Sequence, residues 1–226
     1  MYRSEINRIV QQSLDTLEQF QFHLPPFAHW GLTQWGEHKD ACEEIFNNQL
    51  GWDITDFGKG QFDQFGLVLF TIRNGHPDNL HNQTGKMYAE KIMIARNNQK
   101  TPMHFHWNKM EDIINRNGAV LAFELYAATA DDKLSEEDFS LSVDGMQRTF
   151  HSGDRLELQP GESLSLPPRI YHAFWAEQGD VLIGEVSLVN NDHLDNCFYE
   201  PIGRFPDIIE DEEPKFLLVG DYEKFL

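Results

Sequence analysis

The sequence is poor in cysteine, in positive charge and in long apolar runs, and each shortage excludes a class of protein. Only Cys42 and Cys197 occur among 226 residues, far apart and outside any CxxC pattern, so we expect a reduced protein of the cytoplasm. Eighteen Lys and Arg against 37 Asp and Glu give a formal charge of −19, which disfavours nucleic acid and anionic membranes as partners. The chain has no apolar run of membrane-spanning length and begins with a polar segment, so we expect neither a membrane span nor a secretory signal peptide.

The apolar content is sufficient for one sizeable core, because hydrophobic residues make up 40% of the chain. Short apolar or alternating runs, separated by turn residues, predict a series of short strands, among them 119–128, 170–177 and 180–189. Regularly spaced short strands indicate a sandwich or a barrel. We therefore expect one mainly β domain over residues 1–226, divided into a helical arm (1–51), a β-barrel core (52–189) and an irregular tail (190–226) that wraps over the barrel.

The arm carries two helix signals. Residues 4–20 place apolar side chains such as Ile6 and Val10 at steps of three and four, which predicts an amphipathic helix with Ser4 as its cap. A Pro-Pro pair then breaks the helix. Thr33 is placed to cap a second helix, which continues to the neighbourhood of Gly51.

The stretch PMHFHWNKMEDIINRNG, residues 102–118, carries the strongest chemical signal. Residues two apart in a strand point the same way, so His104 and His106 project from one face. Glu111 follows a short polar turn, and the next strand can bring its carboxylate to the two imidazoles. This pattern indicates a metal site, and the alternative is two histidines on a solvated sheet face.

A second histidine motif favours the metal. In GESLSLPPRIYHAFW, residues 161–175, His172 is remote in sequence, but antiparallel strands can align it with the first pair. Three imidazoles and one carboxylate form a nitrogen and oxygen site without sulfur, which suits Mn²⁺, Fe²⁺, Co²⁺, Ni²⁺ or Zn²⁺. Four protein ligands leave a six-coordinate ion with two open positions, as a chelating substrate requires.

Together the two segments resemble the paired motifs of the cupin superfamily, metal-binding barrels of the jelly-roll type. The first motif is matched by His104, His106, Glu111 and Gly118, and the second motif is matched by Gly161, Pro167 and His172. Asn98 and Arg169 stand where the motifs have glycine, and Ala176 stands where they have asparagine. None of the three is a ligand position. Asn98 tolerates a left-handed turn, whereas Arg169 leaves the geometry of its turn open.

A narrower resemblance covers most of the chain. YAEKIMIARNNQKTPMHFHWNKMEDIINRNG, PPRIYHAFW, GEVSLVNND and YEPIGRFPDIIEDE are similar to segments of the D-lyxose isomerase family. The resemblance implies a homodimeric, manganese-dependent aldose–ketose isomerase that interconverts D-lyxose and D-xylulose. D-Mannose and D-fructose are a further candidate pair.

Isomerisation moves a hydrogen between C1 and C2 of an open-chain sugar, so a cis-enediol route needs a Lewis-acidic metal and a group that carries the proton. Lys109 lies between two predicted ligands, and a nearby metal charge favours its neutral amine. Glu185 can point inward beside His172, and the tail can deliver a carboxylate and a guanidinium. The candidates are Lys109, Glu185, Glu200, Arg204 and Glu210. The alternatives are a solvated loop lysine, an exterior glutamate and a solvated acidic run.

A small monosaccharide is the expected partner, bound through hydrogen bonds and through apolar contact with its C–H faces. We expect PPFAHWG, residues 25–31, to close one wall of the pocket. Tyr88 and Glu90 share one face of their predicted strand, whereas Lys91 faces the other way. The candidates for substrate binding are Trp30, Tyr88, Lys91, Trp107, Arg116 and Phe174.

Three other functions fit parts of the pattern. A cupin dioxygenase or decarboxylase uses the same ligands. A phosphosugar isomerase needs a basic pocket for the phosphate. A sugar sensor needs no metal. The sequence contains no Rossmann or P-loop glycine pattern, so no nucleotide cofactor is expected.

Overall fold

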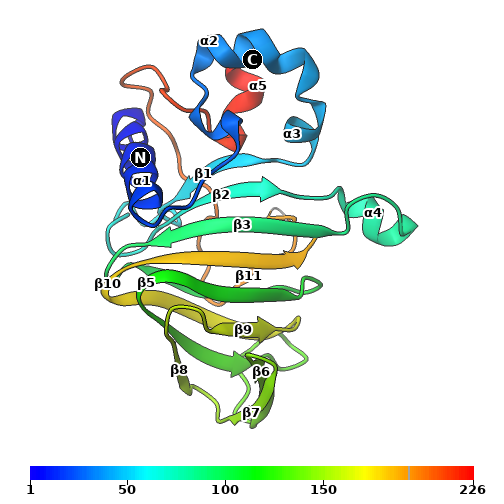
Figure 1. Cartoon of the computed structure of the whole chain (residues 1–226). Helices are drawn as coiled ribbons and strands as arrows, with labels where there is room; N and C mark the ends of the chain where they lie inside the picture. The colour runs from blue at the N-terminus through cyan, green and yellow to red at the C-terminus, as the bar shows by residue number, and fades with distance from the viewer. Residues whose placement is uncertain (193) are drawn as a thin grey trace.

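The fold is built on one antiparallel sheet, seen in a computed structural model that describes residues 1–192 and 194–226. Within the described residues the sheet has eleven strands, and its main path runs β1-β2-β3-β10-β5-β9-β6-β7 (Figure 1). The strands are β1 (Gly51–Thr55), β2 (Leu67–Arg73), β3 (Tyr88–Ala95), β4 (Lys100–Phe105), β5 (Glu111–Ala127), β6 (Phe139–Val143), β7 (Met146–Phe150), β8 (Arg155–Leu158), β9 (Ser163–Leu166), β10 (Ile170–Leu188) and β11 (Cys197–Phe198).

The two long strands β5 and β10 hold the sheet together. They pair along most of their lengths, and each changes its other partner partway. The first half of β10 pairs with β4 and its second half pairs with β3, while β5 pairs with β9 and then with β8. The sequence predicted two strands where β10 is continuous. Gln178 and Gly179, at φ 67° and φ 150°, sit where the pairing with β5 shifts register, so these residues form a bulge rather than a turn.

Helix α1 (Arg3–Gln19) covers the outer face of the sheet over β1 and β2. Its apolar stripe, which includes Ile6 and Val10, packs against Trp52 and Phe70. The amphipathic helix is therefore confirmed. Burial of each large side chain in this layer contributes about 1.5–3 kcal/mol. A second apolar cluster fills the inner face of the sheet, and several of its members line the same cavity as the predicted metal ligands.

The helix starts in the arm differ from those predicted. Tyr2 is the N-cap of α1, and the Ser4 hydroxyl instead donates to the Asp211 carboxylate. The prediction of a single second helix is wrong, because this region contains four short elements. They are η1 (Pro26–His29), α2 (Leu32–His38), η2 (Lys39–Ala41) and α3 (Glu43–Asn47). Thr33 lies inside α2, whose N-cap is Gly31. Only Trp35 is buried in α2 and no residue is buried in α3, so packing provides little support for one long helix.

The described part of the tail forms regular elements in two places. Cys197 and Phe198 form β11 beside β4, and the end of the chain packs on the arm. There, η3 (Val219–Asp221) and α5 (Tyr222–Phe225) place Tyr222 against Trp35 and Phe46. The remaining helix among the described residues, α4 (Pro77–Asn82), lies in the loop between β2 and β3. No helix among the described residues is long and apolar enough to cross a membrane.

Arg3 joins the two ends of the chain from a fully buried position. Its guanidinium donates to the carboxylates of Asp221 at 2.7 and 2.8 Å and of Glu210 at 2.8 Å. Burial lowers the pKa of Arg3, but the two carboxylates outweigh burial and hold it above its usual range. A buried cation with these partners fixes the tail against α1.

We predict that Arg3→Ala lowers the free energy of unfolding by about 3–5 kcal/mol, because it leaves the buried Asp221 carboxylate without its partner. Urea unfolding measures the change. The control is Arg8→Ala, because Arg8 is exposed on the same helix. Equal unfolding midpoints for the two variants would contradict the prediction.

Candidate metal centre and active site

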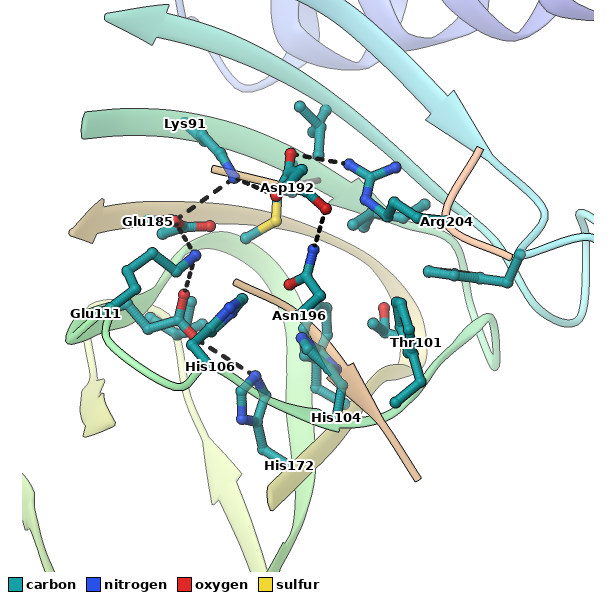
Figure 2. Close-up of a pocket in the computed structure, with 18 residues that line it drawn as sticks. Lys91, Thr101, His104, His106, Glu111, His172, Glu185, Asp192, Asn196 and Arg204 are labelled. Carbon is teal, nitrogen blue, oxygen red and sulfur yellow. Dashed lines mark hydrogen bonds and ion pairs between the residues drawn. The ribbon is translucent and has the colours of Figure 1, made fainter. Parts of the chain in front are cut away.

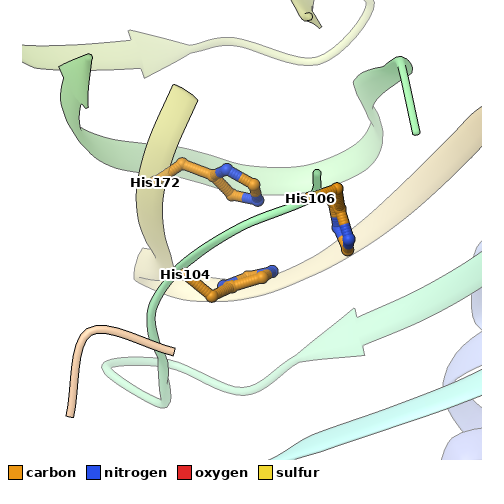
Figure 3. Close-up of side chains that lie close together, drawn as sticks. All are labelled: His104, His106 and His172. Carbon is orange, nitrogen blue, oxygen red and sulfur yellow. The ribbon is translucent and has the colours of Figure 1, made fainter. Parts of the chain in front are cut away.

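Three imidazoles meet on the inner face of the sheet, as predicted. His104 lies on β4, His106 lies just beyond the end of β4, and His172 lies on β10 directly opposite His104 in the strand register. One nitrogen from each ring falls within 4.8 Å of the other two (Figure 3). All three side chains are buried. The pairing of β4 with β10 therefore brings together residues that are far apart in the sequence.

Each imidazole has its Nδ1 against a backbone carbonyl. The distances are 2.8 Å from His104 to Pro102, 3.0 Å from His172 to Ile170 and 2.7 Å from His106 to Asp195. When Nδ1 carries the proton and donates to the carbonyl, Nε2 is left with its lone pair. The three Nε2 atoms can then act together as ligands.

Glu111 supplies a carboxylate beside the imidazoles from the first position of β5. Its Oε1 lies 3.5 Å from His106 Nε2 and 3.3 Å from His172 Nε2. The donor set of three imidazole nitrogens and one carboxylate oxygen, buried and without sulfur, fits a divalent ion such as Mn²⁺, Fe²⁺ or Zn²⁺. These four residues could hold a metal ion together.

The protein environment keeps the imidazoles neutral and the carboxylate charged. Burial, together with Lys109, lowers the pKa of His106 to about 4. Burial also lowers the pKa values of His104 and His172. Burial raises the pKa of Glu111, but Lys109 and the imidazoles outweigh it and hold that pKa below its usual range. Neutral imidazole and charged carboxylate are the forms that bind metal.

The two motif positions without glycine still adopt the left-handed backbone. Asn98 has φ 63° and Arg169 has φ 68°. Arg169 is held there by its own contacts: its N–H donates to the His106 carbonyl at 2.9 Å and its guanidinium donates to Thr129 and Asp132. These contacts offset the strain, so the turn before β10 keeps the geometry that the sequence left open.

A chain of alternating charges leads from the candidate metal centre to the tail (Figure 2). Lys109 Nζ lies 2.8 Å from Glu111 and 2.9 Å from Glu185. Lys91 lies 3.7 Å from the same Glu185 and 3.6 Å from Asp192. At the far end, Arg204 bonds to Asp192 at 3.1 Å and to Asp53 at 2.7 Å. Except for Asp53, these groups line one cavity together with the three histidines.

The neighbouring carboxylates shift the pKa of Lys109 upward, whereas a nearby metal ion was expected to shift it downward. Burial lowers the pKa of Lys109, but Glu111, Glu185 and Asp192 outweigh burial and raise it above its usual range. Among the protein groups alone, Lys109 is therefore a stable ammonium ion. The neutral amine predicted from the sequence would require the metal charge to overcome these carboxylates.

The structure brings some of the predicted residues together and separates others. The candidates that line the cavity are His104, His106, Glu111, His172, Lys109, Glu185, Arg204, Lys91 and Phe174. Lys91 points inward because it alternates with Tyr88 and Glu90 along β3. The remaining candidates lie outside the cavity lining: Glu200, Glu210, Trp30, Tyr88, Trp107 and Arg116.

Three of the candidates outside the cavity lining have partners elsewhere in the structure. Glu200 pairs with Lys59 at 3.0 Å, and Glu210 pairs with Arg3, so neither carboxylate reaches the metal centre. Trp30 packs on Trp35 and stacks on His38, away from the cavity, so the PPFAHWG segment does not form its wall.

The three other excluded side chains face outward. Tyr88 is 48% exposed and Trp107 is 39% exposed. Arg116 is exposed and lies over Gly184 on the outer face of the sheet.

Sequence reasoning missed Thr101, Asp192 and Asn196, which also line the cavity. Thr101 is on β4, three residues before His104, and pairs with Phe174 of β10. Asp192 and Asn196 lie in NNDHLDN, which has no strand or helix period that would orient its side chains. The family-like segment GEVSLVNND was the one available signal, and Asp192 is its last residue.

Comparisons with known proteins indicate one family over nearly the whole chain. A family model described as D-lyxose isomerase matches residues 1–222. The chain is 48% identical to a D-lyxose/D-mannose isomerase of Serratia proteamaculans and 46% identical to one of Escherichia coli O157:H7, each over 100% of both chains. The fold is similar to that of Cellulomonas parahominis L-ribose isomerase, with a TM-score of 0.60 and 15% identity over 92% of this chain and 98% of that one.

We predict that the metal-free protein becomes less stable as the pH falls from 6.5 to about 4. The unfolded chain binds protons at the histidines in this window, whereas the folded chain holds His106 neutral down to about pH 4, so unfolding gains protons. Urea midpoints at pH 7.0 and 5.0 measure the loss, and His106→Gln should reduce it. The control is His81→Gln, at an exposed position. An equal loss in His106→Gln and in the unmodified protein would contradict the prediction.

Proposed function

Because the chain belongs to the D-lyxose isomerase family, we propose that it interconverts D-lyxose and D-xylulose, and also D-mannose and D-fructose. Full-length identity of 46–48% to proteins named D-lyxose/D-mannose isomerase is the observation that carries the proposal. The buried group of three histidines beside Glu111 supports it, because an aldose–ketose isomerase of this type needs a divalent ion and a proton carrier in one cavity.

We assign the metal to His104, His106, His172 and Glu111, and we propose Mn²⁺ as the native ion, with Co²⁺, Fe²⁺, Ni²⁺ or Zn²⁺ as substitutes. Such an ion supplies Lewis acidity toward the two sugar oxygens at C1 and C2. The four residues line the same cavity as Lys91, Glu185 and part of the tail, so an ion held there would supply its chemistry to that cavity.

We assign proton transfer between C1 and C2 to the pair formed by Glu185 and Lys109. Glu185 is a buried carboxylate that faces the cavity, so it is the group suited to accept a proton from carbon and return it through a cis-enediol. Lys109 donates to Glu185 at 2.9 Å and is held as an ammonium ion, so it is suited to stabilise the developing charge on a sugar oxygen.

The charge balance of the cavity favours a sugar without phosphate. Lys91, Lys109 and Arg204 each already pair with carboxylates, so these three protein cations do not form the basic pocket that a phosphate group needs. Arg204 and Lys91 are placed instead to donate to sugar hydroxyls, and Phe174 offers an apolar face. This argues against the phosphosugar alternative.

Four further points belong to the same proposal. The sheet closes as a cupin-type jelly-roll barrel, supported by the two long strands that change partners along their lengths. Residues 1–226 form one domain, supported by the bonds of Arg3 to the tail. The protein acts as a homodimer and in the cytoplasm, as the family resemblance and the low cysteine content suggest.

The activity is tested with a panel of aldoses. We expect the purified protein, stripped with a chelator and restored with Mn²⁺, to convert D-lyxose and D-mannose to ketoses, and the stripped protein to be inactive. The panel includes D-mannose 6-phosphate and a measurement of oxygen uptake. Turnover of the phosphosugar alone, or oxygen uptake with any member, would replace the isomerase proposal by one of its alternatives.

We predict that Lys109→Ala reduces kcat at least 100-fold while one Mn²⁺ per chain is retained, because Lys109 touches Glu185 and is not itself a ligand. Ketose formation and metal analysis measure the two quantities. Lys133→Ala, at a surface lysine, serves as the control. Unchanged kcat in Lys109→Ala would remove this lysine from the mechanism.

A further inference from the structure

The tail segment after β10 carries two acidic residues that reach different parts of the site. Asp192 turns toward Lys91 and Arg204 and belongs to the cavity already described. Asp195 turns toward the loop that joins β4 to β5 and lies outside the cavity lining. Its N–H donates to the Asn191 carbonyl at 3.0 Å, which fixes its place in the segment.

Asp195 makes four polar contacts with residues 106–109. One carboxylate oxygen accepts from the Asn108 N–H at 2.9 Å and from the Asn108 side-chain amide at 3.0 Å. The other oxygen accepts from the Lys109 N–H at 2.9 Å. The Asp195 carbonyl lies 2.7 Å from His106 Nδ1. Asp195 is 8% exposed, so water competes little for these bonds.

His106 depends on this contact in a way that the other imidazoles do not. His104 and His172 each bond a carbonyl two residues earlier in their own strand. His106 lies past the end of β4, and its carbonyl partner is 89 positions away in the sequence. The orientation of the third ring therefore depends on how the tail packs.

We propose that Asp195 is a positioning residue of the metal centre. Its carbonyl holds His106 as the Nδ1–H tautomer, with Nε2 turned toward the other two rings. Its carboxylate fixes the backbone of Asn108 and Lys109, and thereby the Lys109 side chain and the entry into β5 at Glu111. The inference rests on the proposed function in one respect, because it assumes that a divalent ion occupies the centre.

The test is Asp195→Asn, which keeps the size of the side chain but replaces one acceptor by an amide that cannot serve both backbone N–H groups. The variant keeps the backbone carbonyl but weakens the side-chain bonds that hold this carbonyl against His106. Loss of such support around a ligand typically weakens metal binding 10- to 100-fold, so we expect the Mn²⁺ Kd, measured by competition with a chelator, to rise about 10- to 100-fold. We also expect kcat at saturating Mn²⁺ to fall with little change in KM, because the Lys109 ammonium group is displaced.

Asp56→Asn is the matched control. Asp56 is 4% exposed and its carboxylate also accepts from two backbone N–H groups, those of Gly58 and Gly60, but in a different loop. We expect both variants to lower the melting temperature and only Asp195→Asn to weaken Mn²⁺ binding. Equal Mn²⁺ affinity in the two variants would overturn the proposal, because Asp195 would then have a purely structural role.

A second measurement does not depend on any variant folding. In ¹⁵N-labelled, metal-free protein, NMR should report His106 as the Nδ1–H tautomer, and observation of the Nε2–H tautomer would overturn the proposal. The Mn²⁺ affinity and the tautomer are both measured without sugar, so they test the role of Asp195 separately from the proposed isomerase function. A protein that shows the tautomer and the loss of affinity but isomerises no aldose would retain the role of Asp195 and lose the proposed function.

Discussion

The alignment of β4 with β10 is the constraint on which the site depends. His172 stands opposite His104 in this pairing, and the alternation of side chains along β4 then places His106 on the same side. A shift of β4 by one residue would turn His104 and His106 away from the inner face, where His172 of β10 would remain alone. The bulge after His172 and the left-handed turn at Arg169 lie on either side of this point and fix the register.

The electrostatics of the cavity follow from this arrangement. Burial lowers the pKa values of the imidazoles, whereas the neighbouring cations hold the pKa values of Glu111 and Asp192 below their usual ranges. Each paired group offsets the desolvation of its partner, so several charges persist in a buried space. A neutral sugar with many hydroxyl groups can exchange hydrogen bonds with such a chain without adding net charge, which suits a protein whose overall charge is −19.

Prediction from the sequence succeeded where a local period fixes direction. The two-residue repeat placed His104 and His106 together, and the same rule put Lys91 and Tyr88 on opposite faces of β3. The structure then showed that Lys91 is the one that points inward. The prediction failed where contacts between distant parts of the chain determine the position of a side chain. Trp30 joined an aromatic cluster of the arm, and Glu200 and Glu210 found cations elsewhere. Asp192 and Asp195 were missed because their segment has no period, so only the folded tail reveals what they contact.

Metal stoichiometry tests the central claim most directly. After equilibration with Mn²⁺ and removal of unbound ions, elemental analysis should find one Mn²⁺ per chain in the unmodified protein and none in a folded His172→Ala variant. Circular dichroism shows whether the variant is folded, and His81→Ala, at an exposed position, should keep its ion. Full occupancy in His172→Ala would contradict the account, because the three imidazoles would then not act as one site.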